Sequence, residues 1–274
     1  MSPPDLHALF DLASSQGSDV YVGNGLSYPW GGLYGGHIVA QALRAAANTV
    51  DAALLPHSLR AYFIRRGDGQ EPVRYEVDRI RNGRSFATRR VVARQSVGAI
   101  LNLEASFQCA EESADVQTIP FPADLPPLTG LDSTSWSELF ERRPFPEAVL
   151  SGPESGRGRG RVAAWMKVSN DLGKDQLLQR CALAYLSDDL PTEAVVRSWP
   201  EAKKLVDAGQ WPFNASLDHT VWFHRPMRAD RWHLHDLSCH SVVGGRGLAI
   251  GHIFSEEGMH VATVAQEALV RLPR

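Results

Sequence analysis

The stretch DQLLQRCALAYLSDD, residues 175–189, is typical of a long helix with one apolar stripe. Leu177, Cys181 and Ala184 recur at the spacing i, i+4 and i+7, which places them on one face of an α-helix. Position i+11 on that stripe is Asp188. An acid therefore continues the buried face close to the helix C-terminus, where the helix dipole disfavours negative charge by about 0.3–1 kcal/mol.

Two explanations of this acid are open. Asp188 or Asp189 could cap a following helix that begins at Leu190-Pro191, because Asp before Pro is a common helix start. Alternatively, the buried position has a chemical purpose, because burial disfavours the charged form of a carboxyl group and raises its pKa towards that of a useful base.

A second helix upstream resembles the first one. GGHIVAQALRAAANTV, residues 35–50, carries the apolar stripe Val39, Leu43 and Ala46, but no carboxylate lies on it. If Asp188 is catalytic, the upstream copy has lost its site and serves as scaffold.

The segments after the two helices also repeat. The first landmark is a His-led apolar segment, the second an Arg 27 residues after that His, and the third a strand that ends in Gln. They are HSLRAYF (57–63), Arg84 and ASFQ (105–108) in copy one, and HTVWFH (219–224), Arg246 and ATVAQ (262–266) in copy two. Three landmarks in one order indicate an internal repeat.

Strands follow each helix. Residues 101–107 alternate apolar and polar side chains with a period of two, and residues 84–94 and 259–271 show a similar pattern. One long helix followed by several antiparallel strands predicts the α+β class, with a sheet that covers the helix. We expect an N-terminal unit at 1–113, a Pro/Gly-rich linker at 114–160 with one short helix at 135–143, and a C-terminal unit at 161–274.

Composition limits the function. The chain has 274 residues, of which 43% are hydrophobic and 22% charged, which is typical of a globular protein. A net charge of −3 disfavours nucleic acid as a partner. No run of 18 apolar residues is present, so a membrane-spanning segment is not expected. The three dispersed cysteines and the absence of a recognisable signal peptide predict a cytoplasmic location.

Two further polar residues are candidates for a site. Gln266 shares a strand face with Ala262, Val264 and Ala268, and a buried amide without partners costs about 1–3 kcal/mol. It could bond a neighbouring backbone group or belong to a site. Ser216 opens the strand ASLDHTVWFH, and a Ser at a strand edge is most often structural.

Other constellations are weaker. His233 and His235 share a strand face and could suit a metal, but a solvated strand face explains them more simply. Ser216, Asp218 and His219 are the residue types of a nucleophilic triad, but they lie too close along one strand to converge. Cys181 lies on the apolar helix stripe, which favours a core thiol over a nucleophile.

Motifs from both copies resemble the acyl-CoA thioesterase II family. The first copy matches through YGGHIVAQAL (34–43), HSLRAYFIRRGD (57–68), RNGRSFATRRV (81–91) and EASFQ (104–108), and the second through LQRCALAYLSD (178–188), ASLDHTVWFHRP (215–226) and the QE of VAQEALVR (264–271). The resemblance spans about residues 20–110 and 162–272, in order. Ser216 stands where many bacterial members have Thr, and His37 where Gln often follows the two glycines.

The resemblance implies a double hotdog fold, in which two long helices are each wrapped by sheet. It also implies hydrolysis of fatty acyl-CoA to a free acid and coenzyme A. The family's active residues correspond to Asp188, Ser216 and Gln266 here, which would orient a water molecule. No metal or organic cofactor is implied, and a homo-oligomer is expected.

Two other functions compete with this hypothesis. A non-catalytic hotdog scaffold could bind an acyl chain or a protein partner, and Asp188 would then be only a cap. A hydratase or dehydratase acting on an acyl thioester normally needs a catalytic His paired with an acid, and residues 175–189 contain no His. Release of free thiol from acyl-CoA separates hydrolysis from mere binding.

Overall fold

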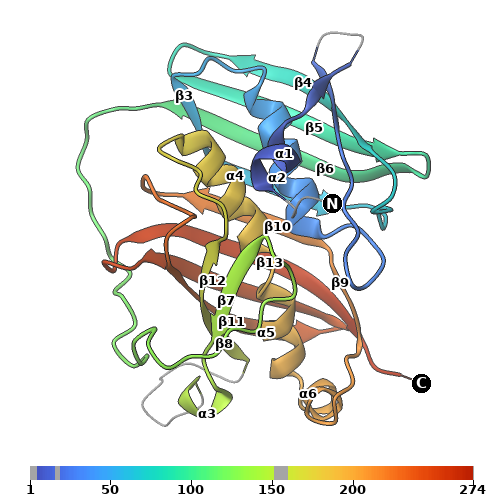
Figure 1. Ribbon diagram of the computed structural model, residues 1–274, viewed down its shortest axis with the longest axis vertical. Helices are drawn as coiled ribbons and strands as arrows, with labels where there is room; N and C mark the ends of the chain where they lie inside the picture. Colours follow the sequence, from blue (N-terminus) through green and yellow to red (C-terminus); the bar gives the residue numbers. More distant parts are fainter. Residues whose placement is uncertain (1–4, 16–18, 151–159, 274) are drawn as a thin grey trace.

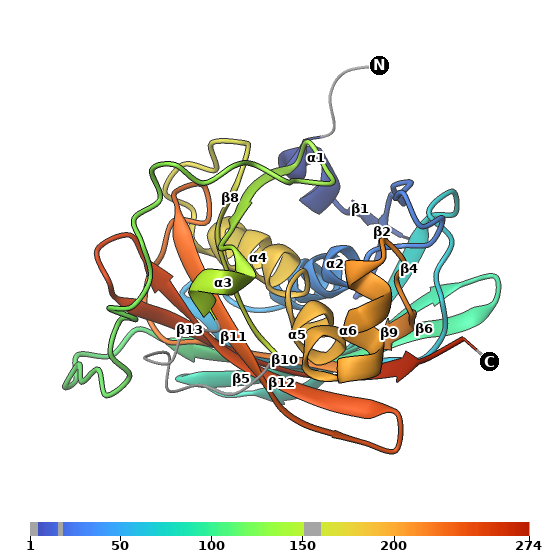
Figure 2. The same cartoon turned by 90° about the horizontal axis from the view of Figure 1, so that it is seen from below.

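The computed structural model describes residues 5–15, 19–150 and 160–273. In these residues, two central helices lie against one continuous antiparallel sheet, α2 (Gly35–Ala47) and α4 (Gln176–Ser187) (Figure 1). Seen from below, the sheet curves beneath both helices (Figure 2). This arrangement of two helix-and-sheet units in tandem confirms the predicted α+β double hotdog fold.

The strands of the N-terminal half are β1 (Ala13–Ser14), β2 (Val20–Gly23), β3 (Leu54–Phe63), β4 (Val73–Asn82), β5 (Phe86–Gln95) and β6 (Gly98–Cys109). Those that follow are β7 (Phe140–Pro144), β8 (Arg161–Val168), β9 (Phe213–Ser216), β10 (Asp218–Phe223), β11 (His233–Val243), β12 (Arg246–Ser255) and β13 (His260–Arg271). The remaining helices are α1 (Leu6–Phe10), α3 (Glu147–Leu150), α5 (Pro191–Ser198) and α6 (Pro200–Asp207).

One strand pair joins the two units. The sheet order is β1-β2-β4-β5-β6-β3-β10-β13-β12-β11-β8-β7, and β9 pairs with β13 beside this path. At the junction β3 and β10 run antiparallel, with Leu59 opposite Val221. Each unit thus offers the other a strand edge, which removes two unpaired edges from the middle of the molecule.

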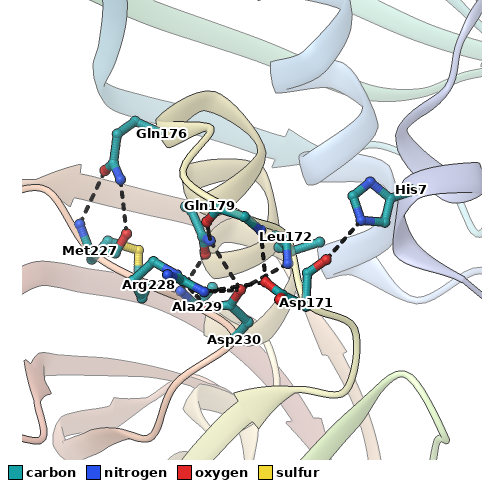
Figure 3. A network of polar contacts seen from close by, with 10 residues as sticks. His7, Asp171, Leu172, Gln176, Gln179, Met227, Arg228, Ala229 and Asp230 are labelled. Carbon is teal, nitrogen blue, oxygen red and sulfur yellow. Dashed lines mark hydrogen bonds and ion pairs between the residues drawn. The ribbon is translucent and has the colours of Figure 1, made fainter.

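Polar contacts fix the start of α4, and Figure 3 shows those of Gln176 and Gln179. Asp175 caps the helix by accepting hydrogen bonds from the Leu177 and Leu178 N–H groups. Gln179 accepts from the Ala229 N–H and donates to the Gly173 carbonyl, which ties the first turn to the loop before β11. Because a helix is stiff, this anchor also sets where its C-terminal end lies.

The start of α2 lies against the end of α4. A Cβ atom on Gly36 would lie 2.2 Å from the Tyr185 carbonyl oxygen, so only glycine allows the start of α2 to approach the end of α4 this closely. The pair Gly35-Gly36 therefore brings the N-terminus of one helix to the C-terminal turn of the other.

The linker differs from its prediction. Residues 140–143 of the expected helix belong to strand β7, because Phe140 to Pro144 pair with Val168 to Ala164 of β8, and a one-turn helix follows at α3. The linker also covers the outer face of the C-terminal sheet, where Phe121 packs on Trp165 and Phe254. Residues 151–159 of the predicted linker lie outside the described residues. No helix among the described residues is long and apolar enough to cross a membrane.

Candidate active site

Asp188 occupies the C-cap position of α4 and is buried, with 7% of its surface exposed. Cys181 and Ala184 on the same stripe are fully buried, so the predicted continuation of the apolar face into an acid is confirmed. The capping explanation is wrong, because α5 has Leu190 at its N-cap and no side-chain cap.

Asp189 has a different purpose from its neighbour. Its carboxylate accepts hydrogen bonds from Trp136 Nε1 at 2.6 Å and from Arg142 Nη1 at 2.9 Å. Arg142 also pairs with Glu193 of α5 at 2.6 Å. These contacts fasten the linker to the junction between α4 and α5 and pair Asp189 with a basic group. The groups that act on Asp188 among the described residues include no basic side chain.

The three residues singled out from the sequence meet at one point. Ser216 Oγ donates to Asp188 Oδ1 at 3.4 Å, and Gln266 Nε2 donates to Ser216 Oγ at 2.7 Å. Gln266 Nε2 also lies 3.3 Å from Thr192 Oγ1 on α5. The partners of the buried Gln266 amide are therefore side chains, and Ser216 is part of this cluster.

A strand irregularity aims Ser216 inward. Thr220 pairs with Ala265, whereas Ser216 pairs with Ala268. The chain from β9 to β10 therefore contains one more residue than the stretch of β13 that it faces. An extra residue of this kind reverses the alternation of side chains along a strand. Ser216 consequently lies on the same face as His219, three positions away.

Burial controls the charge of Asp188. Desolvation raises the pKa of Asp188 to about 7, while hydrogen bonds from the Gly36 N–H, from Gln266 and from Ser216 act to lower it. The nearby Asp189 charge adds to the upward shift. The carboxyl group is therefore poised to exchange a proton near neutral pH.

The N-terminal half contributes its backbone to this site. A Cβ atom on Gly35 would lie 2.5 Å from Asp188 Oδ2, so the start of α2 touches the carboxylate directly. The partial positive charge of a helix N-terminus favours negative charge at this place.

Aromatic side chains flank the site. Tyr34 packs against Tyr185 with ring centroids 5.0 Å apart, and Trp136 lies 5.0 Å from Tyr34. The cluster continues through Tyr28 to Trp30, which is 46% exposed. The cluster thus runs from the exterior to the interior beside the start of α2.

Sequence reasoning considered His219 only as a member of a nucleophilic triad and set it aside. Its Nδ1 lies 2.5 Å from Gln266 Oε1, so His219 joins the cluster through Gln266 and without contacting Ser216 as a base would. Asp218 turns away, accepts from the Glu267 N–H and pairs with Arg60. The strand spacing excluded a nucleophilic triad, but alternation alone could not reveal that residues 216 and 219 share a face.

The remaining candidate residues from the sequence, His233, His235 and Cys181, are buried. His233 and His235 are each only 1% exposed, so their interpretation as a solvated strand face is wrong. Burial lowers the pKa of His233 to about 4 and that of His235 to about 3. No cluster of metal ligands occurs within the described ranges. Cys181 is a core thiol, and burial raises its pKa to about 12.

The assembled groups suit a bound water molecule. Asp188 can accept a proton, while a hydroxyl and an amide beside it can hold a neutral polar molecule without taking charge. The catalytic roles of Asp188, Ser216 and Gln266 remain a prediction.

Comparison with known proteins identifies the relatives of this chain. Residues 26–108 match the family described as acyl-CoA thioesterase N-terminal domain, and residues 113–270 match the acyl-CoA thioesterase C-terminal domain. Acyl-CoA thioesterase 2 of Haemophilus influenzae is 35% identical over 87% of this chain and 87% of its own length. Human acyl-coenzyme A thioesterase 8 is 33% identical over 93% of this chain and 85% of its own length.

Solved structures agree with the sequence matches. An acyl-CoA thioesterase II from Mycobacterium marinum superposes with a TM-score of 0.82 at 37% identity and covers 98% of this chain and 97% of its own. A hot dog protein of unknown function from Alicyclobacillus acidocaldarius superposes with a TM-score of 0.78 at 18% identity over 98% of both chains, which shows the fold alone. The chain belongs to the acyl-CoA thioesterase II family.

Proposed function

We propose that this protein hydrolyses the thioester of fatty acyl-CoA to a free fatty acid and coenzyme A. The observation that carries the proposal is the buried Asp188 carboxylate, in reach of the Ser216 hydroxyl and close to the Gln266 amide. The relatives named as acyl-CoA thioesterases support the substrate class. They also disfavour the alternative of a non-catalytic scaffold.

In the proposed mechanism, ionised Asp188 takes a proton from a water molecule while the water oxygen attacks the thioester carbonyl carbon. The carbon–sulfur bond then breaks, the acyl group leaves as the acid, and the proton passes to the departing coenzyme A sulfur. Ser216 and Gln266 orient the water before the attack, and this pre-orientation lowers the activation free energy of the attack. The N-terminus of α2 faces the same place and favours the negative charge that develops on the carbonyl oxygen.

The aromatic cluster beside the site supports the proposal that the acyl group of the substrate is apolar. Trp30 and Trp136 lie at its outer end and Tyr185 at its inner end. Burial of an acyl chain against such surfaces gains about 0.8 kcal/mol per methylene group. A thiol-release profile across acyl lengths would define the preference.

Asp188→Asn tests the mechanism directly. We expect kcat for thiol release from acyl-CoA to fall by about 10²–10⁴-fold, because Asn cannot accept the proton. Asp175→Asn is the matched control on the same helix, because Asn caps a helix as well as Asp does. Undiminished turnover in Asp188→Asn would overturn the assignment of the base.

The pH dependence follows from the direction of the pKa shift. The base form of Asp188 exists above its raised pKa of about 7, so kcat/KM should rise with pH through neutrality and level off above it. A profile that is flat between pH 5 and 8 would contradict a base of this kind.

The Asp188→Asn variant also tests the raised pKa of Asp188 through the pH dependence of protein stability. Since the folded pKa of Asp188 lies above its ordinary value of 3.8, the folded state binds more protons than the unfolded state between these values, and stability falls as pH rises through this window. Asp188→Asn removes that loss. The variant should be more stable than the parent above pH 7, by up to about 4 kcal/mol, and equal to it near pH 4.

Assembly and location are further parts of the proposal. We expect a homo-oligomer, which light scattering on the purified protein would establish. All three cysteines are free thiols, which supports a reducing, cytoplasmic environment.

A further inference from the structure

A chain of buried hydrogen bonds leaves the end of α4 and returns to it. Ser187 Oγ lies 2.8 Å from His219 Nε2, and His219 Nδ1 lies 2.5 Å from Gln266 Oε1. Gln266 then donates to Ser216, and Ser216 donates to Asp188, the residue after Ser187. Ser187, His219 and Gln266 are each at most 2% exposed, so water does not compete for these bonds.

The charge of Asp188 decides which way the Gln266 amide faces. An ionised carboxylate can only accept hydrogen bonds, so the side of the amide that faces it must present the NH₂ group. In the structure Gln266 Nε2 donates to Ser216 Oγ, which in turn donates to Asp188 Oδ1. The amide oxygen must therefore point to the opposite side, where His219 lies.

An amide oxygen facing His219 Nδ1 fixes the protonation of the ring. Nδ1 has to carry the proton that Gln266 Oε1 accepts, and Nε2 is left to accept from the Ser187 hydroxyl. Burial lowers the pKa of His219 to about 4, so the ring is neutral at pH 7 and only one nitrogen carries a proton. Ser187 Oγ also lies 3.1 Å from the Ala184 carbonyl oxygen. With the ring proton on Nδ1, the single Ser187 proton is directed to the closer Nε2, 2.8 Å away.

We propose that His219 is a positioning residue for the proposed hydrolysis: its Nδ1–H holds Gln266 Oε1, so that the Gln266 NH₂ group faces Ser216 and Asp188. This inference rests on the proposed function of the same site. Without His219 the amide can rotate by half a turn at little cost, and it would then present its oxygen to the carboxylate. That orientation repels the ionised base and can no longer donate to Ser216.

The first test reads the proton on the ring directly. In protein labelled with ¹⁵N-histidine, the His219 signals, assigned by their loss in His219→Asn, should show Nδ1 protonated and Nε2 bare at pH 8, where Asp188 is ionised. This is the less common tautomer of free histidine, so its dominance would indicate a specific acceptor for the Nδ1–H. A ring protonated at Nε2 would overturn the proposal, because Gln266 would then have to face the other way.

The second test compares two replacements of His219, one that can donate a hydrogen bond to Gln266 and one that cannot. The Asn amide nitrogen lies where Nδ1 lies in histidine and can still donate to Gln266, whereas Leu cannot. We expect kcat to fall on the order of 10²-fold in His219→Leu and by less than about tenfold in His219→Asn, with KM within about twofold in both. His240→Asn, at an exposed His on β11, is the control and should match the parent. Equal losses in His219→Leu and His219→Asn would contradict the proposal.

A double variant separates positioning from a general structural effect. Because His219 acts through Gln266, adding His219→Leu to Gln266→Ala should lower kcat by no more than about twofold further. Full additivity of the two losses would overturn the proposal. Absence of thiol release by the parent protein would instead refute the proposed function, and the tautomer measurement would still test the His219–Gln266 bond.

Discussion

The two halves end their central helices in the same way but place different side chains around the helix end. The Thr49 hydroxyl after α2 and the Ser187 hydroxyl of α4 each lie close to the carbonyl oxygen three residues earlier, at 2.8 and 3.1 Å. The next position is Asp188 in the C-terminal half and Val50 in the N-terminal half. The same backbone therefore ends in an acid on one side and in an apolar residue on the other.

The strands show the same contrast once the register is known. Gln266 lies opposite Ala249, and Phe107 lies opposite Ala87 at the corresponding place of the other half. The sequence match of Gln108 with Gln266 is thus one residue out of register. A shift of one residue moves a side chain to the other face of a sheet, so Gln108 points away from the helix.

The histidines that mark the repeat also diverge. His219 is fully buried against Gln266, whereas His57 bonds the Ser106 hydroxyl at 2.9 Å on the outer face of the sheet. The register of β3 shifts between Pro56 and Ser58, so the irregularity falls on His57 itself. In the C-terminal half the extra residue comes before His219, which keeps that ring inside.

In the N-terminal half, a buried arginine lies beside the end of α2. Arg89 is 2% exposed and donates to the Thr49 hydroxyl and carbonyl, to Asn82 and to two further carbonyls. The register places Gly251 at the corresponding position of the C-terminal half. The comparison shows that one scaffold supports either a reactive site or a sealed structural one, depending on a few side chains.

Exchanging residues between the halves should give the largest effect. We expect Gln266→Phe to lower kcat by about 10²–10³-fold, because it removes the donor to Ser216. The reciprocal Phe107→Gln should leave kcat near that of the parent but reduce stability by about 1–3 kcal/mol, since an amide is then buried without partners. Thiol-release kinetics and urea unfolding measure both. Equal loss of kcat in the two variants would show that the halves are not functionally distinct.

Removing the arginine should weaken the sealed half. Arg89→Met leaves the Thr49 and Arg81 carbonyls among the acceptors without a donor, so we expect a loss of about 2–3 kcal/mol in the free energy of unfolding. Activity per folded molecule should stay within about twofold of the parent, because Arg89 contacts the end of α2, whereas Asp188 lies at the end of α4. A fall in kcat without loss of stability would contradict the division between the halves.

The smallest effect tests where the halves touch. Gly35→Ala places a methyl group 2.5 Å from Asp188 Oδ2, and a small displacement of the carboxylate should lower kcat by about 10–100-fold. Gly32→Ala is the control, because the nearest atoms to the added methyl group there belong to the flexible side chain of Arg66. Unchanged kcat in Gly35→Ala would mean that α2 does not shape the site.

The sequence by itself determined the fold class, the repeat and the acid on the helix stripe. These depend on local periodicity, which fixes the buried face of each helix and strand wherever the chain folds. The short helix expected at 135–143 failed because pairing with β8 outweighed local preference. The motifs shared with the family added Ser216 and Gln266 to the prediction.

Only the tertiary structure decided which polar residues meet. A strand bulge put Ser216 and His219 on one face, and the contact between Gly35 of one half and Asp188 of the other crosses more than 150 residues of chain. Likewise, the pKa of Asp188 depends on how much water the packed halves exclude. Alternation and spacing describe neighbours along the chain, whereas register shifts and helix packing arise between distant segments, so no local pattern could have specified them.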